Sequence, residues 1–328
     1  MNGFSPSILA GLIALAAGGC ALEATRERPA VEVERRAVDF LRAEVPAWSK
    51  DNGCFSCHNN GDAARALYAA GRAGFRVPAD ALADTTAWVT QPAQWKDNKG
   101  DPGFSDQRLA NIQFAASLLA AIESGHATDR GPLEEAARMV AADQDSDGGW
   151  NIEPGNAVGS PATHGTTLAT FMALRVLVHA GLPETDKASQ KAASWLQKLL
   201  LQNVPTAATL LMASRSGCLE LSRRRQGECL DFIRRAQTGD GGWGPYPDSP
   251  PEPFDTALVL LAIADRSGET DVKLLVQDGR RFLIARQEPD GGWPATTRPP
   301  GAVSYAQRIS TTAWVTLALL ATRDSAAH

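Results

Sequence analysis

Three stretches of the sequence align without gaps: EEAARMVAADQDSDGGW (134–150), GECLDFIRRAQTGDGGW (227–243) and QDGRRFLIARQEPDGGW (277–293). Each has a glutamine six residues before a tryptophan, and each ends in Asp-Gly-Gly-Trp. The last two tryptophans are 50 residues apart, and the first two are 93 apart, which is close to twice that distance. A regular period of this length is typical of a repeat architecture.

Each repeat predicts a helical hairpin. The segment before the tryptophan is amphipathic, with Arg and Glu on one side, as expected of an outer helix. A loop rich in Pro and Gly follows it, and then an apolar run at 164–181, 254–268 or 310–323. These runs are apolar nearly all round, which predicts buried inner helices, and the threonine at the start of each is expected to cap the helix.

Three weaker copies fill the gaps between the clear repeats. They pair 33–48 with 62–74, 78–95 with 105–125, and 186–203 with 204–217. The corresponding points of the six inner helices have a mean spacing of 50 residues. Six helical hairpins therefore account for residues 32–323, and we expect one closed domain rather than two.

The repeat resembles that of the terpene cyclase and protein prenyltransferase superfamily, and its Gln…Gly-x-Trp element looks like the QW motif of squalene–hopene cyclases. The resemblance covers almost all of residues 32–323. It implies an all-α (α/α)6 toroid of six hairpins with a central cavity. It also implies that Trp150, Trp243 and Trp293 fasten adjacent hairpins rather than contact a ligand.

The chemistry of that superfamily does not transfer as readily as its fold. Its cyclases start the reaction with a strong acid in an Asp-x-Asp-Asp-Thr-Ala motif. The best match here is Glu-Pro-Phe-Asp-Thr-Ala (252–257), which puts Phe254 at the position of the proton-donating Asp. The zinc ligands of prenyltransferases have no counterpart at the matching repeats. The resemblance therefore implies a fold and a cavity, not an activity.

A haem-attachment motif lies in NGCFSCHNNG (52–61), which contains Cys54-x-x-Cys57-His58. Two thiols at this spacing on a turn can both reach the vinyl groups of one haem c, and the adjacent imidazole then ligates the iron. The repeat alignment places the motif just before the first inner helix, at the mouth of the cavity. The alternatives are a Cys54–Cys57 disulfide, or a zinc or copper site made by the same three residues.

His164 is the candidate for the other axial position of the haem iron. In the repeat alignment the first and third inner helices correspond at residues 62 and 167. His164 lies three residues before the latter and His58 four before the former, so both are expected at one end of the ring. His164 is predicted to be a distal ligand or a pocket acid or base. The alternative is that it caps a helix or lies in a loop. Met172 and Met212 fall within helices and are interpreted as core residues.

The N-terminus has the features of an export signal. An apolar run over 8–17 has the length of a signal segment, and Ala-Gly-Gly precedes Cys20, which resembles a bacterial lipoprotein signal. We expect residues 1–20 to be the signal, Cys20 to be lipidated, 21–31 to be a linker and 324–328 to be a tail. The protein would then lie in the periplasm, anchored to a membrane through lipid.

Two further cysteines and the net charge bear on the compartment and on the kind of partner. Cys218 and Cys229 are predicted to form a disulfide, which suits an oxidising compartment, and two separate buried thiols are the alternative. A net charge of −5 over 328 residues gives no reason to expect nucleic-acid binding.

The sequence thus predicts an exported toroid that carries one covalent haem c. Its expected function is electron transfer or a haem-dependent redox reaction, with a redox partner that the sequence does not identify. One alternative is a terpenoid or prenyl-type enzyme with an apolar or isoprenoid ligand in the cavity. Another is a binding scaffold in which Cys54, Cys57 and His58 form a structural or metal site. Whether the protein is an enzyme stays open.

Overall fold

The computed structural model describes residues 30–98, 106–152, 158–298 and 305–323. The predicted signal, Cys20 and the tail lie outside these ranges, as does all but the end of the predicted linker, so export and lipid anchoring stay predictions. Within these ranges the secondary structure is helical, without strands. None of the helices in them combines the length and hydropathy needed to cross a membrane.

The helices follow one another in a regular order. The α-helices are α1 (Ala30–Asn52), α2 (Asn59–Arg72), α3 (Ala83–Val89), α4 (Gln107–Glu123), α5 (Gly131–Ala142), α6 (Gly165–Ala180), α7 (Asp186–Gln197), α8 (Val204–Arg215), α9 (Arg223–Ala236), α10 (Pro253–Ile263), α11 (Thr270–Ala285) and α12 (Tyr305–Ala321). Short 3₁₀ helices are η1 (Ala79–Ala81), η2 (Pro92–Asp97), η3 (Pro183–Thr185) and η4 (Ala264–Arg266).

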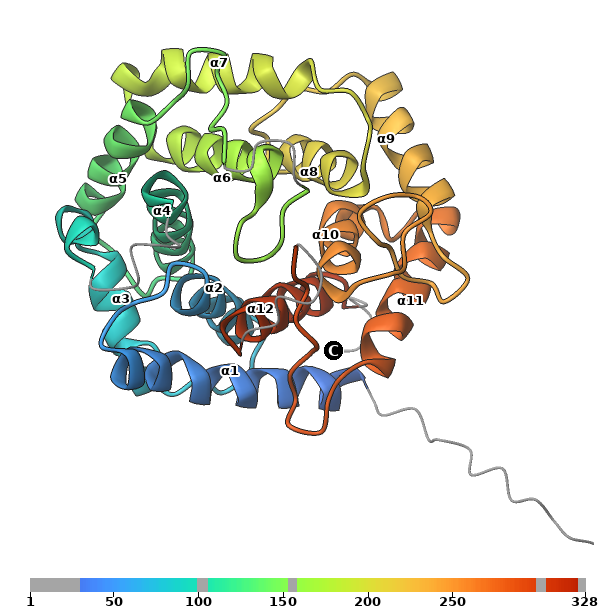
Figure 1. The fold of residues 1–328 in the computed structure, drawn as a ribbon, viewed down its shortest axis with the longest axis horizontal. Coiled ribbons are helices and arrows are strands. Elements are labelled where there is room, and N and C mark those ends of the chain that lie inside the picture. Colours follow the sequence, from blue (N-terminus) through green and yellow to red (C-terminus); the bar gives the residue numbers. More distant parts are fainter. Residues whose placement is uncertain (1–29, 99–105, 153–157, 299–304, 324–328) are drawn as a thin grey trace, which may run out of the picture.

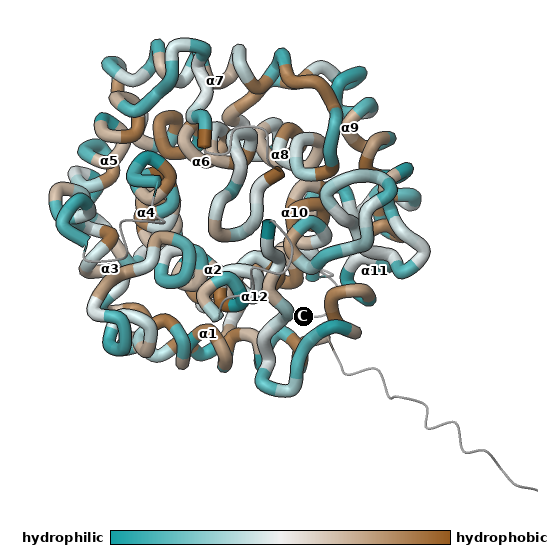
Figure 2. The backbone as a smooth tube through the Cα atoms, in the orientation of Figure 1, coloured by the Kyte–Doolittle hydropathy of each residue, from teal (hydrophilic) through white to brown (hydrophobic). Residues whose placement is uncertain are grey.

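These helices form two concentric rings (Figure 1). The odd-numbered helices make the outer ring and the even-numbered helices the inner ring, and α12 packs against both α1 and α2 to close the circle. This confirms the predicted (α/α)6 toroid of six hairpins. Hydrophobic residues follow the inner ring, and hydrophilic residues gather on the outer helices and loops (Figure 2).

Burial explains why the two kinds of helix differ in sequence. In the inner helix α10 nearly every residue is buried, whereas the outer helix α9 buries only Cys229, Leu230, Ile233 and Ala236. An inner helix contacts neighbours on both sides and its own outer helix, so it has no polar face to present to solvent. An outer helix contacts protein along one stripe only.

The three repeat tryptophans are fully buried. Each indole Nε1 donates to a backbone carbonyl ten residues earlier, those of Val140, Ile233 and Leu283, at 2.8–2.9 Å. Each indole thereby fixes its loop against the end of its own outer helix. These tryptophans are packing residues, as predicted, but their indole bonds hold the loop and outer helix of one hairpin rather than two adjacent hairpins.

The threonines of the inner helices have a different role from the predicted one. Thr170, Thr256 and Thr312 lie within α6, α10 and α12, and each hydroxyl accepts the backbone N–H of the repeat tryptophan at 3.0–3.1 Å. They therefore join the loop to the inner helix and do not cap it. In the third hairpin the threonine that makes this bond is Thr170, three residues after residue 167, which the repeat alignment predicted.

Two of the repeat glutamines link one hairpin to the next, while Gln237, among the described residues, donates only to Gly241 in its own turn. Gln144 donates to the carbonyl of Gly148 in its own turn and to that of Ala188 in the next outer helix, at 2.9 and 2.8 Å. Gln287 donates in the same way to Gly291 and Val33. The latter bond joins the last repeat to α1, so the repeat element itself helps to close the ring.

A buried carboxylate also closes the ring. Glu34 on α1 is 1% exposed and lies 3.1 Å from Arg280 on α11, and its other oxygen accepts from Arg323 after α12 at 2.6 Å. Buried carboxylates depend on such partners, because an unpaired buried charge is strongly destabilising. The first and last hairpins are therefore joined by charge as well as by packing.

Candidate functional site

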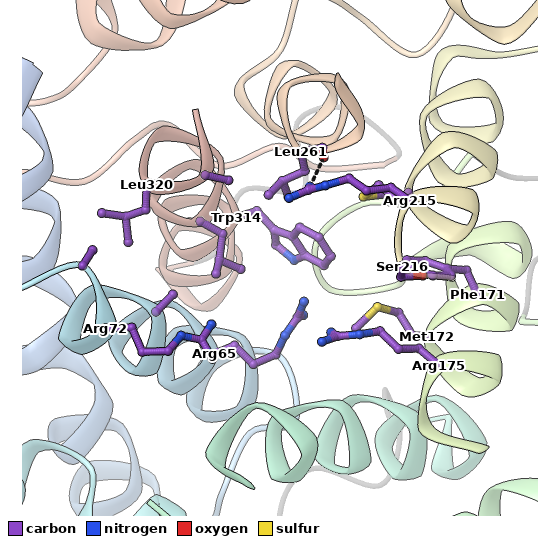
Figure 3. Close-up of a pocket in the computed structure, with 15 residues that line it drawn as sticks. Arg65, Arg72, Phe171, Met172, Arg175, Arg215, Ser216, Leu261, Trp314 and Leu320 are labelled. Atoms are coloured by element: carbon purple, nitrogen blue, oxygen red, sulfur yellow. Dashed lines mark hydrogen bonds between the residues drawn. The ribbon is translucent and has the colours of Figure 1, made fainter. Parts of the chain in front are cut away.

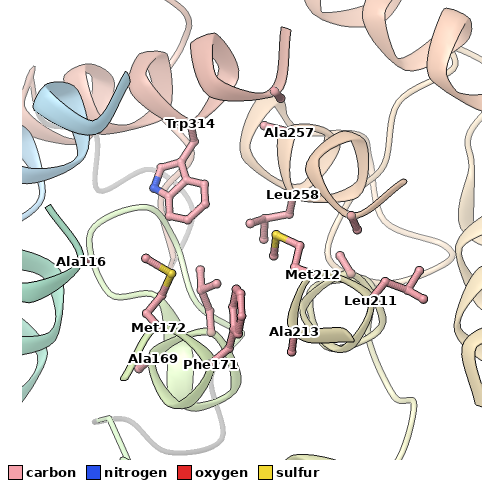
Figure 4. Close-up of a cluster of buried hydrophobic side chains, with 14 of the residues drawn as sticks. Ala116, Ala169, Phe171, Met172, Leu211, Met212, Ala213, Ala257, Leu258 and Trp314 are labelled. Carbon is pink, nitrogen blue, oxygen red and sulfur yellow. The ribbon is translucent and has the colours of Figure 1, made fainter. Parts of the chain in front are cut away.

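A cavity of about 580 Å³ lies between the inner helices, at their C-terminal ends. We call it the ring pocket; residues of α2, α6, α8, α10 and α12 line it (Figure 3). Its apolar lining includes Phe171, Met172, Met212, Leu261, Leu317, Leu320 and Trp314. Met172, Met212, Phe171 and Trp314 converge on the middle of the ring from three helices (Figure 4). The two methionines are buried, as predicted, but they also form the wall of this pocket.

Four arginines share the ring pocket with these apolar groups: Arg65, Arg72, Arg175 and Arg215. They lie on α2, on α6 and at the end of α8. The sequence predictions missed all four. Their signal was an arginine inside an otherwise apolar inner-helix run, as Arg175 is in FMALRVLVH.

Asp62 lies behind Trp314, which lines the ring pocket. The indole Nε1 of Trp314 donates to Asp62 Oδ2 at 3.0 Å, and Arg65 donates to Asp62 Oδ1 at 2.8 Å. The Arg65 guanidinium also lies 4.8 Å from the centroid of the Trp314 ring. Burial raises the pKa of Asp62, but His164, Arg65 and the Trp314 indole together outweigh it, so this pKa lies below its usual range.

His164 lies on the other side of Asp62, immediately before α6. It is 2% exposed, and its Nε2 lies 3.7 Å from Asp62 Oδ2. Its φ of 54° is the one positive value of a non-glycine residue in the described ranges. Its ring meets that of Trp314 edge to face at 5.6 Å. The strained backbone thus holds the imidazole buried against Asp62 and Trp314.

The structure places His58 and His164 at the same end of the ring, as predicted. Each is the residue that precedes its inner helix, α2 or α6. Burial lowers the pKa of His58 to about 4, with Asp62 opposing this shift and His164 adding to it. The two histidines are therefore near enough for the charge of one to act on the other.

The haem motif does not open into the ring pocket. Cys54 and Cys57 are free thiols at the N-terminal end of α2, and the pocket lies at the C-terminal ends of the helices. Phe55 of this loop stacks on Trp88 at 4.9 Å. Cys57 Sγ lies 3.8 Å from His58 Nδ1, and burial raises the pKa of the Cys57 thiol to about 12.

The part of the chain that the structure describes brings together no group of three or more His, Cys, Asp or Glu that could hold a metal ion. The iron-ligand roles of His58 and His164, and covalent haem at Cys54 and Cys57, stay predictions. So does the disulfide between Cys218 and Cys229, which are two buried free thiols here.

Phe254 and Asp255, within the cyclase acid motif, are fully buried. Phe254, at the position of the acid, meets Trp314 edge to face at 5.5 Å. Asp255 forms an ion pair with Arg298, and the same arginine donates to the carbonyl of Gly159. Burial raises the pKa of Asp255 to about 7, although Arg298 opposes the shift. Asp255 thus holds Arg298, which in turn binds the loop at Gly159. Phe254 places an apolar ring where the cyclases have their proton-donating Asp.

Comparisons with known proteins agree with the toroid. No family model matches the chain. A drimenyl diphosphate synthase from Streptantibioticus cattleyicolor is 24% identical over 206 residues, which are 58% of this chain and 37% of that protein. One from Streptomyces showdoensis is 36% identical over 73 residues, which are 22% of this chain and 14% of that protein. The chain thus matches well under half the length of these relatives.

Among solved structures, the type II terpene cyclase MstE from Scytonema, a variant in complex with geranylgeranyl dihydroxybenzoate, has a TM-score of 0.59 and 14% identity. The match covers 90% of this chain and 98% of that one. These likenesses overturn the prediction of an electron-transfer or haem-dependent redox protein, because both point to terpene cyclases and synthases. That prediction rested on the short Cys54-x-x-Cys57-His58 motif, whereas the repeat that predicts the toroid covers most of the chain. The chain has the toroid fold of type II terpene cyclases.

Proposed function

We propose that the protein binds an isoprenoid compound in the ring pocket. The observation that carries the proposal is the pocket itself, in which apolar side chains from five inner helices converge at the centre of the toroid. Flexible methionines next to rigid aromatic rings suit a branched hydrocarbon chain, since thioethers adapt their shape and aromatic faces pack against methyl groups. The terpene synthase and cyclase likenesses support the same ligand class.

A reaction of this ligand would need a starting group other than the one in cyclases. Phe254 has no proton to donate, and its ring is packed against Trp314. We therefore propose that the pocket binds the isoprenoid, without a reaction that starts from an acid at this position. A function cannot be taken from the fold alone, because it depends on the groups at the site.

The test is binding of an uncharged prenyl alcohol, such as farnesol or geranylgeraniol, measured by calorimetry or by a thermal shift. Leu317→Trp places a larger side chain at a half-buried position that lines the pocket, and we expect it to abolish binding. Leu274→Trp, at a position of the outer helix α11 that is 58% exposed, is the matched control and should bind normally. Equal binding by both variants would place the ligand elsewhere.

A further inference from the structure

We propose that the ring pocket selects an isoprenoid with an anionic head group, a phosphate or diphosphate ester, and that Arg65 and Arg175 bind this head together. The inference rests on the proposed isoprenoid function and adds to it the chemistry of the ligand's polar end. It assigns a binding role to two residues that neither the repeat nor the cyclase motif includes.

The two guanidinium groups face each other across the pocket. Arg65 extends from α2 and Arg175 from α6, and their ends approach one another beside the Trp314 ring (Figure 3). Burial is the main cause that lowers the pKa of Arg65, and the charge of Arg175 adds to it, so the two groups lie close together. Two like charges held together in a partly buried site repel each other, and an anion bound between them would remove that repulsion.

Both arginines are held in place from behind. Asp62 accepts from Arg65 at 2.8 Å, and the two Glu123 oxygens accept from Arg175 at 2.6 and 2.7 Å. Neither carboxylate is among the residues that line the ring pocket. A guanidinium has five N–H donors, so each arginine keeps donors for a ligand after these bonds are made. The carboxylates therefore fix the orientation of the two side chains.

The other residues that line the pocket also favour an anionic ligand. Arg72 and Arg215 also line it, and among the described lining residues there is no carboxylate. Arg215 donates to the carbonyl of Leu261 at 2.7 Å, which holds it over the pocket beside the apolar wall. Guanidinium groups bind phosphate oxygens in a fork of two parallel hydrogen bonds, so several of them at one site favour an oxyanion with many acceptors.

The apolar and basic parts of the lining adjoin each other, which fits an amphiphile better than either a hydrocarbon or a free anion. The chain would lie against Met172, Met212 and Leu317, and the head would lie between the arginines. An uncharged isoprenoid would offer few acceptors to the guanidinium donors that Asp62 and Glu123 do not use, whereas a phosphate or diphosphate would satisfy them.

The experiment compares three probes by calorimetry on the folded, full-length protein: farnesyl diphosphate, farnesol and inorganic diphosphate. Wild type should bind farnesyl diphosphate at least about tenfold more tightly than farnesol, as expected for charge-assisted hydrogen bonds. Arg175→Gln should remove about tenfold of that preference and leave farnesol binding unchanged. Arg224→Gln is the matched control, because Arg224 lies on the outer helix α9 and is well exposed. Arg72→Gln, at an exposed rim position, provides a second variant if Arg175→Gln does not fold.

The outcomes separate this inference from the proposed function. Farnesol binding as tight as that of farnesyl diphosphate, in wild type and Arg175→Gln alike, would overturn the anionic head and leave the isoprenoid function standing. Binding of inorganic diphosphate that Arg175→Gln abolishes, without binding of either prenyl compound, would overturn the isoprenoid function and show the anion site alone. A preference for the diphosphate that survives in both Arg175→Gln and Arg72→Gln would contradict an anion site made by the arginines of the ring pocket.

Discussion

At the scale of single residues, Trp314 is where the fold and the site meet. Its indole N–H bonds Asp62 of the first hairpin, its ring contacts His164 and Phe254, and one side of it lines the ring pocket. The sequence indicated the buried repeat tryptophans because their surroundings recur three times. Trp314 stands in an apolar run with no such pattern, so its partners could be identified only from the closed ring.

Replacing Trp243 with Ala should lower the free energy of unfolding by roughly 3–5 kcal/mol, the usual effect of removing a large buried aromatic side chain. Its side chain is fully buried and bonds the carbonyl of Ile233. Urea unfolding followed by circular dichroism measures the change. Tyr246→Ala, at a 45% exposed position, should change stability by less than about 0.5 kcal/mol. Equal effects of the two substitutions would show that the repeat tryptophan does not hold the hairpin.

Asp255 should make the stability depend on pH. The pKa of Asp255 is about 7 in the folded protein, whereas the ordinary value for an Asp side chain, as in the unfolded chain, is 3.8. Between these two pH values the folded state holds a proton that the unfolded state has released. The stability contributed by this group is therefore present at low pH and is lost as pH rises to about 7.

The difference in unfolding free energy between wild type and Asp255→Asn should accordingly fall from about pH 4 to about pH 7 and then stay level. Denaturant unfolding at a series of pH values measures it. Asp240→Asn, at a largely exposed side chain, should give a difference that changes little with pH. A flat difference for Asp255→Asn would mean that this carboxyl is ionised throughout, in its ion pair with Arg298.

At the scale of elements, the sequence predicts the hairpins well because each carries its own local signals. Amphipathic and fully apolar runs alternate, and turns rich in glycine separate them. The second outer element was the least regular, and the structure divides it into η1, the short helix α3 and η2. The threonine bonds to the loop were missed because they form between segments that only the folded hairpin brings together.

The glycine turn of the repeat offers a test at this scale. Gly241 has a φ of +86°, and an added Cβ would lie 2.8 Å from the carbonyl oxygen of Asp278. Gly241→Ala should therefore destabilise by about 1–3 kcal/mol through strained backbone and a steric clash. Gly239→Ala, two residues earlier and with nothing within 4 Å of its added Cβ, should be nearly neutral. A thermal unfolding comparison that finds both equally stable would contradict the role of this turn.

At the scale of the whole molecule, the candidate site could be predicted only in part. The repeat predicted a ring with a central cavity, and His58 and His164 were correctly placed at one end of it. Arg65 and Arg175 face each other because the closed ring brings the first and third hairpins together. No pattern in the sequence relates these two residues. The CxxCH motif, by contrast, is a strong local signal, and it directed the functional prediction away from the cavity.

Closure of the ring should depend on Glu34. Removing it in Glu34→Ala leaves Arg280 and Arg323 without their buried partner, so unfolding free energy should fall by about 3–5 kcal/mol. Glu134→Ala, which removes one carboxylate of an exposed pair with Arg138, should cost less than about 1 kcal/mol. Guanidinium unfolding distinguishes the two. Similar small effects would show that the first and last hairpins are held by packing alone.

Photo-crosslinking with a prenyl alcohol that carries a photoreactive group, followed by peptide mapping, would locate the isoprenoid on the protein. We expect labels on the C-terminal parts of the inner helices, around Met172, Met212 and Leu317, and we expect unlabelled farnesol to suppress them. Labels confined to the outer helices, or labels that farnesol does not suppress, would contradict an isoprenoid site inside the ring.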